Sequence, residues 1–572
     1  MNNKGFAITG ILYGLMILFV IVITSFLAVV VGKSKRDNEV LNNVKESLSL
    51  NSSKTVYWSK FNYANYGWTY NGYRYSYVTD RRALYTFENA DYDTCVSMYL
   101  PKGTVVIIDS EGRLSYSLYG SENEAEFKEM SDSCYGELYN KPNSPDLVDG
   151  LIPVVYNETT SKWVKADSTN ENNSWYNYNE KKWANAVLVT SVNRSIYQNA
   201  KSGEEILDND ILAFYVWIPR YKYKVWNKDK VIGTDSYNAQ TTGIDIRFEN
   251  GTASTGTISC TYSFATPSLS AGSPNETCTG TNGDYYTHPA FTFGDVEVKG
   301  FWIGKFELTG TNSKVTILPS AKSLREQTIN SFNTIVQNMQ TTNNIYGLST
   351  DKTITDSHMI KNMEWGAVAY LTNSNYGRCA EGSCTEVMNN NCSNYITGVG
   401  ASILASGATV MSCTSNKYTT ITGEKASTTE NLYGVYDMSG GAYEYVMGNS
   451  SVSSGEFKFN TSDSKINTTW YELNNNKKYL DEYAYASTQT SANQQAYNRG
   501  RLGDATGEVI LSSGGYGAWY ADGAHFASSS SSWFYRGGYN DDASIAGIFN
   551  FDRGSGLSLE TFTTRATLVS LK

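Results

Sequence analysis

The stretch from 434 to 449, GVYDMSGGAYEYVMGN, constrains the fold of this chain more than any other part of the sequence. Asp437 can close an Asx-turn, and Gly440 and Gly441 can take the positive φ that residues with side chains resist. Side chains then alternate with a period of two, which predicts a strand in which Glu444 lies among bulky aromatic residues. The stretch therefore predicts a turn, a glycine pivot and a strand.

Glu444 needs a partner if this strand is buried. An unpaired carboxylate inside a protein costs much more free energy than one that is hydrogen-bonded to a cation. Arg536 and Arg565, both far downstream, are the candidate partners because a guanidinium can donate two parallel hydrogen bonds to one carboxylate. The sequence thus predicts a long-range buried ion pair.

The same stretch resembles the signature of the formylglycine-generating-enzyme (sulfatase-modifying factor) family, whose usual form is close to G-x-Y-D-M-x-G-N-x-W-E-W. Here Gly441 stands in place of the Asn, and Tyr443 and Tyr445 stand in place of the two Trp. Two later landmarks are similar as well, RGGY at 536–539 and TTR at 563–565. The structural signature that the resemblance implies comprises Asp437, Gly440, Gly441, Glu444, Arg536, Gly537, Gly538 and Arg565.

Two upstream segments complete this resemblance. FWIGKFEL at 301–308 resembles the opening strand of the family, and MEWGAVAYLT at 363–372 resembles its helix with the pattern W-x-x-A-x-x-Y. The resemblance implies an α+β fold for 211–572, namely the C-type-lectin-like fold of the formylglycine-generating-enzyme subclass. This fold hosts both enzymes and binding proteins, so function has to be argued from the site.

The catalytic residues of the resembled enzymes are not found at matching positions. By the resemblance, two active-site cysteines should lie between the RGG landmark and the end of the chain, but no cysteine follows Cys413. Related iron-dependent enzymes need a histidine triad, whereas His288, His358 and His525 are scattered. We therefore expect no enzyme, no catalytic residue and no cofactor, with structural calcium as an open possibility. The alternative is an oxidoreductase of the formylglycine-generating type that acts on a peptide cysteine.

Composition limits the partners and the number of domains. A chain of 572 residues is too long for one ordinary core, so two or three soluble units are expected. The sequence has 44 Tyr and 12 Trp but only 18% charged residues, which suits β-rich extracellular domains. The net charge of -10, without an evident basic patch, argues against nucleic acid as a partner.

The eight cysteines predict disulfide bonds. An even number of cysteines in an oxidising compartment usually forms disulfides, and zinc is less favoured here because the close C-x-x-C spacing is absent. Pairs are expected between sequence neighbours, but the sequence does not settle the pairing of the last four. The candidates are Cys95, Cys134, Cys260, Cys278, Cys379, Cys384, Cys392 and Cys413.

The region from 6 to 50 predicts a membrane helix that continues as a stalk. Residues 6–31 carry no charge, and about 26 residues at a rise of 1.5 Å exceed the ~30 Å hydrocarbon core of a bilayer. The apolar residues of 37–50 continue at helical spacing. We expect a single-pass protein of the cell membrane.

Residues 1–5, MNNKG, followed by Phe6 resemble the leader and cleavage site of type IV prepilins. Gly10 replaces the Glu that is usual five residues after the cut, which fits a minor or pilin-like anchor better than a major pilin. The Lys and Arg residues at 33–36 would place the bulk of the chain inside by charge count. The cysteines, the sparse charge and the leader together favour an extracellular bulk.

Three further regions are expected outside the membrane. Residues 56–145 alternate between strand patterns and Gly or Asn turns, which predicts a small β domain. Residues 147–205 hold many Trp and Tyr residues and predict a separate aromatic-rich β module, whose rings either stack on sugars or, as we favour, fill a small core. Residues 211–572 form the third, with helices predicted at 324–339, capped by Ser323, and at 357–371.

The segment 539–563 is the predicted ligand-binding surface. Apolar anchors within it alternate with small and polar residues, and by the resemblance this late segment faces the ligand. It also resembles the variable region of proteins diversified by retroelements, and Glu560 is the one residue in it that adenine-directed mutagenesis of Asn codons cannot produce. An ordinary polar loop is the alternative. The predicted binding residues are Tyr539, Asn540, Asp541, Asp542, Ser544, Ser555, Leu557, Leu559 and Thr561.

The sequence thus predicts a membrane- or pilus-anchored bacterial surface protein that binds an extracellular protein or glycan through its C-terminal domain. A structural minor pilin, with pilin subunits as partners, is a further alternative.

Overall fold

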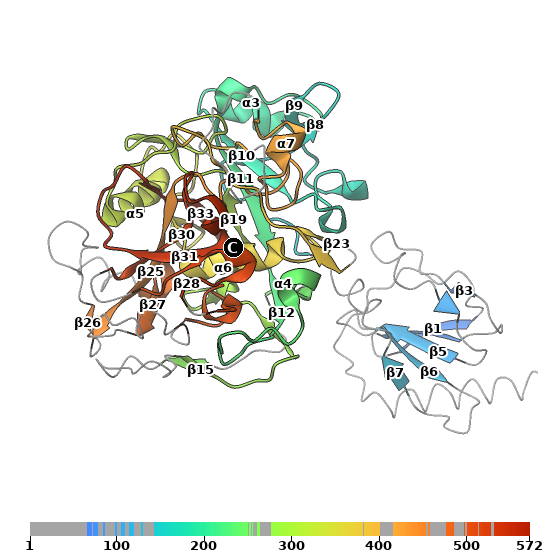
Figure 1. Cartoon of the computed structure of the whole chain (residues 1–572). Coiled ribbons are helices and arrows are strands. Elements are labelled where there is room, and N and C mark those ends of the chain that lie inside the picture. Colours follow the sequence, from blue (N-terminus) through green and yellow to red (C-terminus); the bar gives the residue numbers. More distant parts are fainter. Residues whose placement is uncertain are drawn as a thin grey trace, which may run out of the picture. The chain divides into compact units, whose positions relative to one another are not determined.

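The structure is a computed structural model that describes short strands between 66 and 129 and most of the chain from 142 onward (Figure 1). In that second part it describes all residues except 250, 253, 255–259, 263–275, 381, 401–415, 454–455, 458–475, 485–496, 498–499, 513 and 528–530. The chain forms two compact units, Met1–Lys141 and Pro142–Lys572. The predicted leader at 1–5 and the predicted membrane helix and stalk at 6–50 lie outside the described residues. No helix in the described part of the chain is long and apolar enough to cross a membrane.

The first unit contains an antiparallel sheet of five strands in the order β1-β2-β5-β6-β7. Its strands are β1 (Tyr66–Tyr70), β2 (Tyr73–Tyr77), β5 (Thr104–Ile108), β6 (Leu114–Leu118) and β7 (Phe127–Glu129), while β3 (Leu84–Tyr85) pairs with β4 (Met98–Tyr99). These strands lie within the predicted small β domain, but the unit ends at Lys141 and not at 145. The candidate disulfide residues Cys95 and Cys134 lie outside the described residues.

The second unit contains an antiparallel sheet of seven strands in the order β22-β33-β19-β11-β10-β8-β9. The last strand of the chain, β33, lies between β22 and β19, so the end of the sequence is part of the core. The strands are β8 (Leu151–Asn157), β9 (Lys162–Lys165), β10 (Asn185–Val189), β11 (Ile211–Pro219), β19 (Gly300–Gly304), β22 (Thr355–Met359) and β33 (Ala566–Ser570).

This sheet corrects the predicted separation of 147–205 from 211–572. Strand β10 pairs with β8 on one side and with β11 on the other, so both regions share one sheet. Trp163 packs against Phe214 with ring centroids 5.5 Å apart, and Trp175 stacks on Trp302 at 6.4 Å. The aromatic residues are core residues, which is the alternative that we favoured over stacking on sugars. The core is that of the whole second unit, because rings of this size need more partners than a short module supplies.

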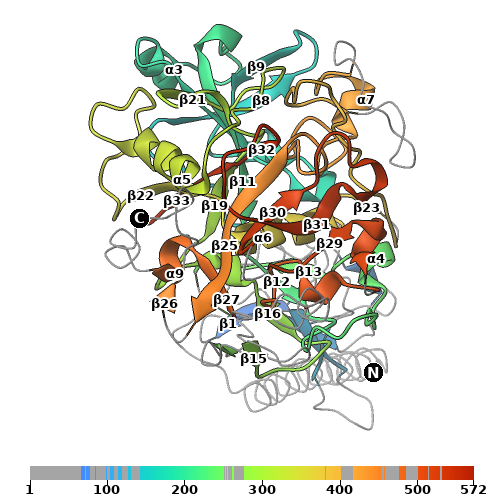
Figure 2. The ribbon, with the colours of Figure 1, turned by 60° about the vertical axis from the view of Figure 1, so that its left-hand side comes forward.

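A second sheet of eight strands carries the signature stretch. Its main path is β26-β25-β30-β31-β29-β28, and β27 and β32 pair with β25 in parallel. Figure 2 shows β25 as the long strand that runs past β30 and β31. The strands are β25 (Tyr443–Ser453), β26 (Glu456–Phe457), β27 (Asp481–Ala484), β28 (Gly515–Tyr516), β29 (Gly523–Ala524), β30 (Trp533–Gly537), β31 (Gly547–Gly554) and β32 (Phe562–Thr563).

Two helices of the second unit begin later than predicted. Helix α5 (Ile329–Gln337) is capped by Thr328, whose Oγ1 accepts a hydrogen bond from the backbone N–H of Ser331, and not by Ser323. Helix α6 (Asn362–Thr372) starts after β22, and its residues are buried on every side. The prediction of a helix from 357 was wrong because residues up to 359 belong to β22, and a helix that is buried on every side has no polar face to mark where it begins.

The remaining elements are short and complete a mixed α+β unit in which sheets predominate. The short helices are α3 (Arg194–Asn199), α4 (Ala239–Thr242), α7 (Ile421–Glu424) and α9 (Asn476–Tyr479). The short strands are β12 (Tyr221–Lys224), β13 (Ile246–Phe248), β14 (Cys260–Tyr262), β15 (Glu276–Cys278), β16 (Tyr285–Thr287), β17 (Thr292–Phe293), β18 (Val296–Glu297), β20 (Thr309–Thr311), β21 (Lys314–Thr316), β23 (Cys379–Ala380) and β24 (Ser383–Cys384).

Arg565 is the partner of Glu444. Both side chains are fully buried, the Nε of Arg565 donates to Glu444 Oε2 at 3.0 Å, and its Nη2 donates to Oε1. The remaining donors of Arg565 reach the carbonyl oxygens of Gly304 at 2.8 Å and Tyr436 at 2.9 Å. Arg536, the other candidate, donates instead to Asn362 Oδ1 at 3.0 Å. One guanidinium therefore joins β25, the end of β19 and the turn before the signature strand.

The glycine pivot has the predicted geometry. Gly440 has a φ of 76° and Gly441 a φ of 77°. A Cβ at Gly441 would lie 2.3 Å from Oε1 of the buried Glu307, so a side chain is excluded by space as well as by backbone conformation. Asp437 accepts hydrogen bonds from the N–H of Gly398 and from Asn390 Nδ2, both at 2.8 Å, and holds a neighbouring loop against the turn.

We expect the substitution Arg565→Met to lower the free energy of unfolding by about 3–5 kcal/mol, because it leaves the buried Glu444 without a cation. Chemical denaturation of the full chain measures this loss. The matched control is Lys572→Met, which removes an exposed ion pair to Asp149 at 3.2 Å and should cost less than about 0.5 kcal/mol. Equal effects of the two substitutions would contradict the central role of the buried pair.

Candidate ligand-binding surface

The predicted binding residues lie on two loops at opposite ends of β31. Loop 538–546 connects β30 to β31, and loop 555–561 connects β31 to β32. The ends of an extended strand of eight residues are about 23 Å apart. Both loops nevertheless return to Tyr443 of β25, because Tyr443 contacts the ring of Tyr539 and its N–H donates to the carbonyl of Thr561 at 2.9 Å.

Loop 538–546 is fixed by hydrogen bonds from its inner side. Asn540 is 7% exposed, its N–H donates to Gly441 O at 2.9 Å, and its Nδ2 donates to Cys392 O at 2.7 Å. Asn540 therefore anchors the loop and is not available to a ligand, which corrects its prediction as a binding residue. Asp541 and Ser544 are exposed on the outer side.

Loop 555–561 is fixed in the same manner. The N–H of Ile329 at the start of α5 donates to Gly556 O at 3.1 Å, and the hydroxyl of Tyr445 donates to Leu557 O at 3.2 Å. The side chains of Leu557 and Leu559 are nevertheless 41% and 48% exposed. The backbone of the loop is thus hydrogen-bonded to the rest of the unit, and two leucine side chains lie in solvent. Ser555 and Thr561, at the ends of the loop, are half-buried.

A cluster of aromatic rings lies under the two loops. The ring of Tyr443 is 4.6 Å from that of Tyr535, 4.8 Å from Tyr539 and 5.2 Å from Phe562, measured between centroids. Phe562 also stacks on Tyr445 at 4.4 Å. We call Tyr443, Tyr535, Tyr539 and Phe562 the aromatic cluster. Tyr535 and Phe562 are buried, whereas Tyr443 of β25 and Tyr539 of the loop are half-buried.

Three carboxylates surround this aromatic cluster. Asp542 Oδ2 accepts the N–H of Tyr539 at 3.1 Å, and its Oδ1 accepts the hydroxyl of Tyr443 at 3.2 Å. Burial raises the pKa of Asp542 to about 6, and the charges of Asp552 and Asp541 add to the shift. Asp552 pairs with His525 at 3.2 Å. Asp542 therefore orients two rings of the cluster, a structural role that its prediction as a simple ligand contact did not include.

Tyr395 is a residue of this surface that sequence reasoning missed. It has a φ of 55°, and the guanidinium of Arg325 lies 4.1 Å from its ring centroid. Burial raises the pKa of Tyr395, and among the charges that act on it are Glu560 from one loop and Asp541 from the other. Tyr395 thus lies between the two loops. The residues around Tyr395 in the sequence gave no indication of a binding role; only the nearby cysteines stood out there.

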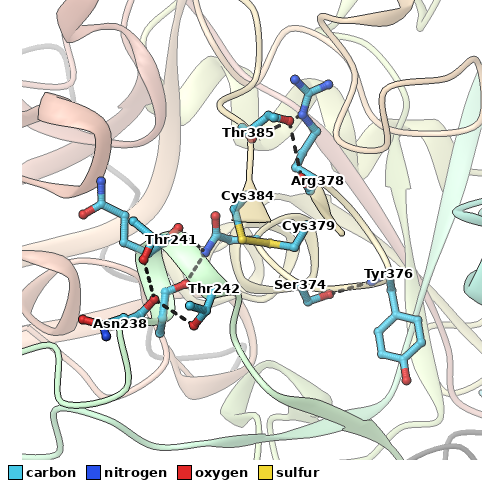
Figure 3. The surroundings of a disulfide bond; sticks show 12 residues. Asn238, Thr241, Thr242, Ser374, Tyr376, Arg378, Cys379, Cys384 and Thr385 are labelled. Carbon is cyan, nitrogen blue, oxygen red and sulfur yellow. Dashed lines mark hydrogen bonds between the residues drawn. A yellow bond between two sulfur atoms is a disulfide. The ribbon is translucent and has the colours of Figure 1, made fainter. Parts of the chain in front are cut away.

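Four of the described cysteines are disulfide-bonded. Cys379 and Cys384 are bonded to each other, beside Thr241 and Thr242 of α4 (Figure 3). Cys278 is disulfide-bonded and stands opposite Cys260 in the β14–β15 pair, and Cys392 is also disulfide-bonded. Cys413 lies outside the described residues. The residues labelled around the C-x4-C disulfide in Figure 3 include none of the predicted binding residues.

The three histidines occupy three different environments. His288 is buried among aromatic rings, and burial lowers its pKa to about 3. His358 lies between two carboxylates, with Nδ1 3.1 Å from Asp356 and Nε2 2.9 Å from Glu364. His525 is the one that reaches the candidate surface, through Asp552. The described part of the chain contains no group of three or more His, Cys, Asp or Glu side chains placed to hold a metal ion.

Comparisons with known proteins do not assign a family to this chain. No protein-family model matches the sequence, and no curated protein matches it.

We expect the double substitution Leu557→Ser with Leu559→Ser to change the free energy of unfolding by less than about 0.5 kcal/mol, because both side chains project into solvent. Phe562→Ala, three residues further on, should cost about 3–5 kcal/mol because it empties the centre of the aromatic cluster. Thermal and chemical denaturation measure both effects. A large loss of stability in the leucine variant would mean that these side chains belong to the core.

We expect His358 to make stability dependent on pH. Burial alone would lower its pKa, but Glu364 and Asp356 outweigh burial and raise it. The stabilisation is therefore complete below the pKa of about 6.5 of an unfolded histidine and is lost as the pH rises through the higher folded pKa. The difference in free energy of unfolding between the wild type and His358→Gln should shrink from pH 6.5 upward. A difference that grows with pH would contradict this assignment.

Proposed function

We propose that this protein is a membrane- or pilus-anchored bacterial surface protein whose second unit binds an extracellular ligand and catalyses no reaction. The binding surface consists of loops 538–546 and 555–561 with the aromatic cluster between them. The observation that carries this proposal is the exposure of Leu557 and Leu559 on a loop whose backbone is hydrogen-bonded to α5 and to β25. Two neighbouring leucines on a backbone held in place, next to a cluster of aromatic rings, support an interaction site more than scattered apolar residues do.

The fold that we propose for this unit is C-type-lectin-like, of the formylglycine-generating-enzyme subclass. Three observations support it: the glycine pivot at Gly440 and Gly441, the buried pair of Glu444 with Arg565, and helices α5 and α6 beside the sheets. These features occur in the order that the resemblance implies. In such a scaffold, loops on a rigid sheet do the recognising.

An extracellular location, with anchoring by the apolar segment 6–31, is part of the proposal. The disulfide between Cys379 and Cys384 supports it, because disulfides persist in oxidising compartments and are rare in the cytosol. The leader-like residues 1–5 are consistent with export by a pilin-type route.

We further propose that the segment 539–563 is diversified between copies of this gene. Its apolar anchors Ile548, Phe549 and Phe551 are at most 3% exposed, whereas Asp541, Ser544, Leu557 and Leu559 point outward. Substitution at the outward positions would therefore alter the surface without emptying the core. A near-repeat of these codons that differs only at adenines, next to a reverse transcriptase, would be the genomic mark of this process.

Panning of a random-peptide phage library and probing of a glycan array, both with the full chain, test the binding function. We expect ligands that bind the wild type to bind the Leu557→Ser, Leu559→Ser variant at least tenfold more weakly. This corresponds to about 1.4 kcal/mol of binding free energy.

The matched control replaces two other aliphatic side chains that are exposed outside the candidate surface. Val192 and Ile196 at α3 are 81% and 63% exposed, so Val192→Ser with Ile196→Ser removes similar apolar area and should leave binding unchanged. Equal binding by both variants, or no selectable ligand of either chemistry, would overturn the proposed surface.

A further inference from the structure

We infer that the ligand of this surface is a protein that places an Arg or Lys side chain on the aromatic cluster, among Asp541, Asp542 and Asp552, and an apolar side chain against Leu557 and Leu559. This inference rests on the proposed binding function and specifies the chemistry of the ligand.

Two of the three carboxylates of the surface, Asp541 and Asp542, have no ion-pair partner among the described residues. None of the ion pairs among the described residues includes Asp541 or Asp542, and the donors to Asp542 are an amide N–H and a phenol, which carry no charge. Asp552 has one basic neighbour, His525. The raised pKa of Asp542 has the same origin, because burial and two nearby carboxylates disfavour its charged form. A cationic ligand group would relieve this excess of negative charge.

Two arginines at or beside the surface, Arg553 and Arg325, are not paired with its carboxylates among the described ion pairs. Arg553 donates to the carbonyl of Phe526 at 3.3 Å. Arg325 lies over Tyr395 and donates to the carbonyl of Glu560. Among the described residues, Asp541 and Asp542 therefore have no cationic partner, and Asp552 has only His525.

The rings of the aromatic cluster suit a cation better than they suit a neutral group. A guanidinium or ammonium is attracted to the face of a tyrosine, and the attraction is stronger when carboxylates stand beside the ring. The chain uses the same contact internally, with Arg325 4.1 Å from the ring of Tyr395 and Arg247 3.9 Å from that of Tyr285. Tyr539 offers the half-exposed ring for such a contact from a ligand.

The two leucines favour a protein over a glycan. Leu559 precedes Glu560, whose charge acts on Tyr395 together with that of Asp541 from the other loop, so the loop with the leucines and the loop with the carboxylates lie on either side of one residue. A neutral glycan would satisfy neither the carboxylates nor the leucines. Tyrosine rings, leucines and two carboxylates without a described ion-pair partner match a protein surface that carries basic and apolar residues together.

A defined peptide probe tests this inference. The peptide Gly-Leu-Arg-Leu-Gly, displayed in many copies on a sensor surface, should bind the full chain, and the same peptide with citrulline in place of Arg should bind at least tenfold more weakly. Citrulline has nearly the same shape as Arg but no charge, so the difference isolates the cation. Binding should also weaken as the salt concentration rises.

Substitutions on the protein complete the test. Asp541→Asn with Asp552→Asn should weaken binding of the arginine peptide at least tenfold. Glu158→Gln with Glu204→Gln removes the same charge from exposed positions near β8 and α3 and should change binding less than twofold, which controls for attraction to the overall charge of -10.

Three results would overturn the inference: no binding of the arginine peptide, equal binding of the citrulline peptide, or equal losses in the two carboxylate variants. Its failure is distinguishable from failure of the binding function. If the binding of library or array ligands depends on Leu557 and Leu559 but not on a cation in the ligand, the proposed binding surface is supported and the inference about its ligand is wrong. If the Leu557→Ser, Leu559→Ser variant binds these ligands as tightly as the wild type does, the proposed surface and the inference are both wrong.

Discussion

The buried pair of Glu444 and Arg565 is the interaction on which the rest of the second unit depends. A guanidinium with no exposure is stabilised by acceptors placed around it, and Arg565 finds them on Glu444, Gly304 and Tyr436. These acceptors belong to β25, β19 and the turn before the signature strand. One residue near the end of the chain therefore fixes the relative position of the two sheets, and the aromatic cluster is built on the strand that this pair holds.

The two loops of the candidate surface are held in place by the strand and the turn that the Glu444–Arg565 pair fixes. Gly441, held by the pivot, accepts the N–H of Asn540, and Tyr445 on the signature strand donates its hydroxyl to Leu557 O. Side chains that face inward in these loops make hydrogen bonds, whereas those of Asp541 and Leu559 face solvent. A surface of this kind can change its outward residues at little cost in folding free energy, because the inward bonds are mostly made by the backbone.

Several features of the site were accessible from the sequence, and others were not. The glycine pivot follows from local backbone chemistry, and Arg565 was one of two candidates for Glu444 because buried carboxylates need guanidinium partners. The anchoring role of Asn540 was not accessible, because its acceptor on Cys392 lies 148 residues upstream. Tyr395 was missed for the same reason, since only folding brings it between the two loops. The start of α5 was misplaced because apolar spacing extends beyond the residue that caps the helix.

The sequence by itself determined which segments could turn, alternate and be buried, because φ preferences and side-chain periodicity are local properties of the chain. It therefore indicated the signature strand, the pivot and the late segment that carries the candidate surface. Only the tertiary structure decided that 147–205 joins the same sheet as 211–572, that Arg565 and not Arg536 meets Glu444, and that two loops from opposite ends of β31 meet at one aromatic cluster. These outcomes depend on contacts between residues far apart in the chain, which packing selects and local pattern does not encode.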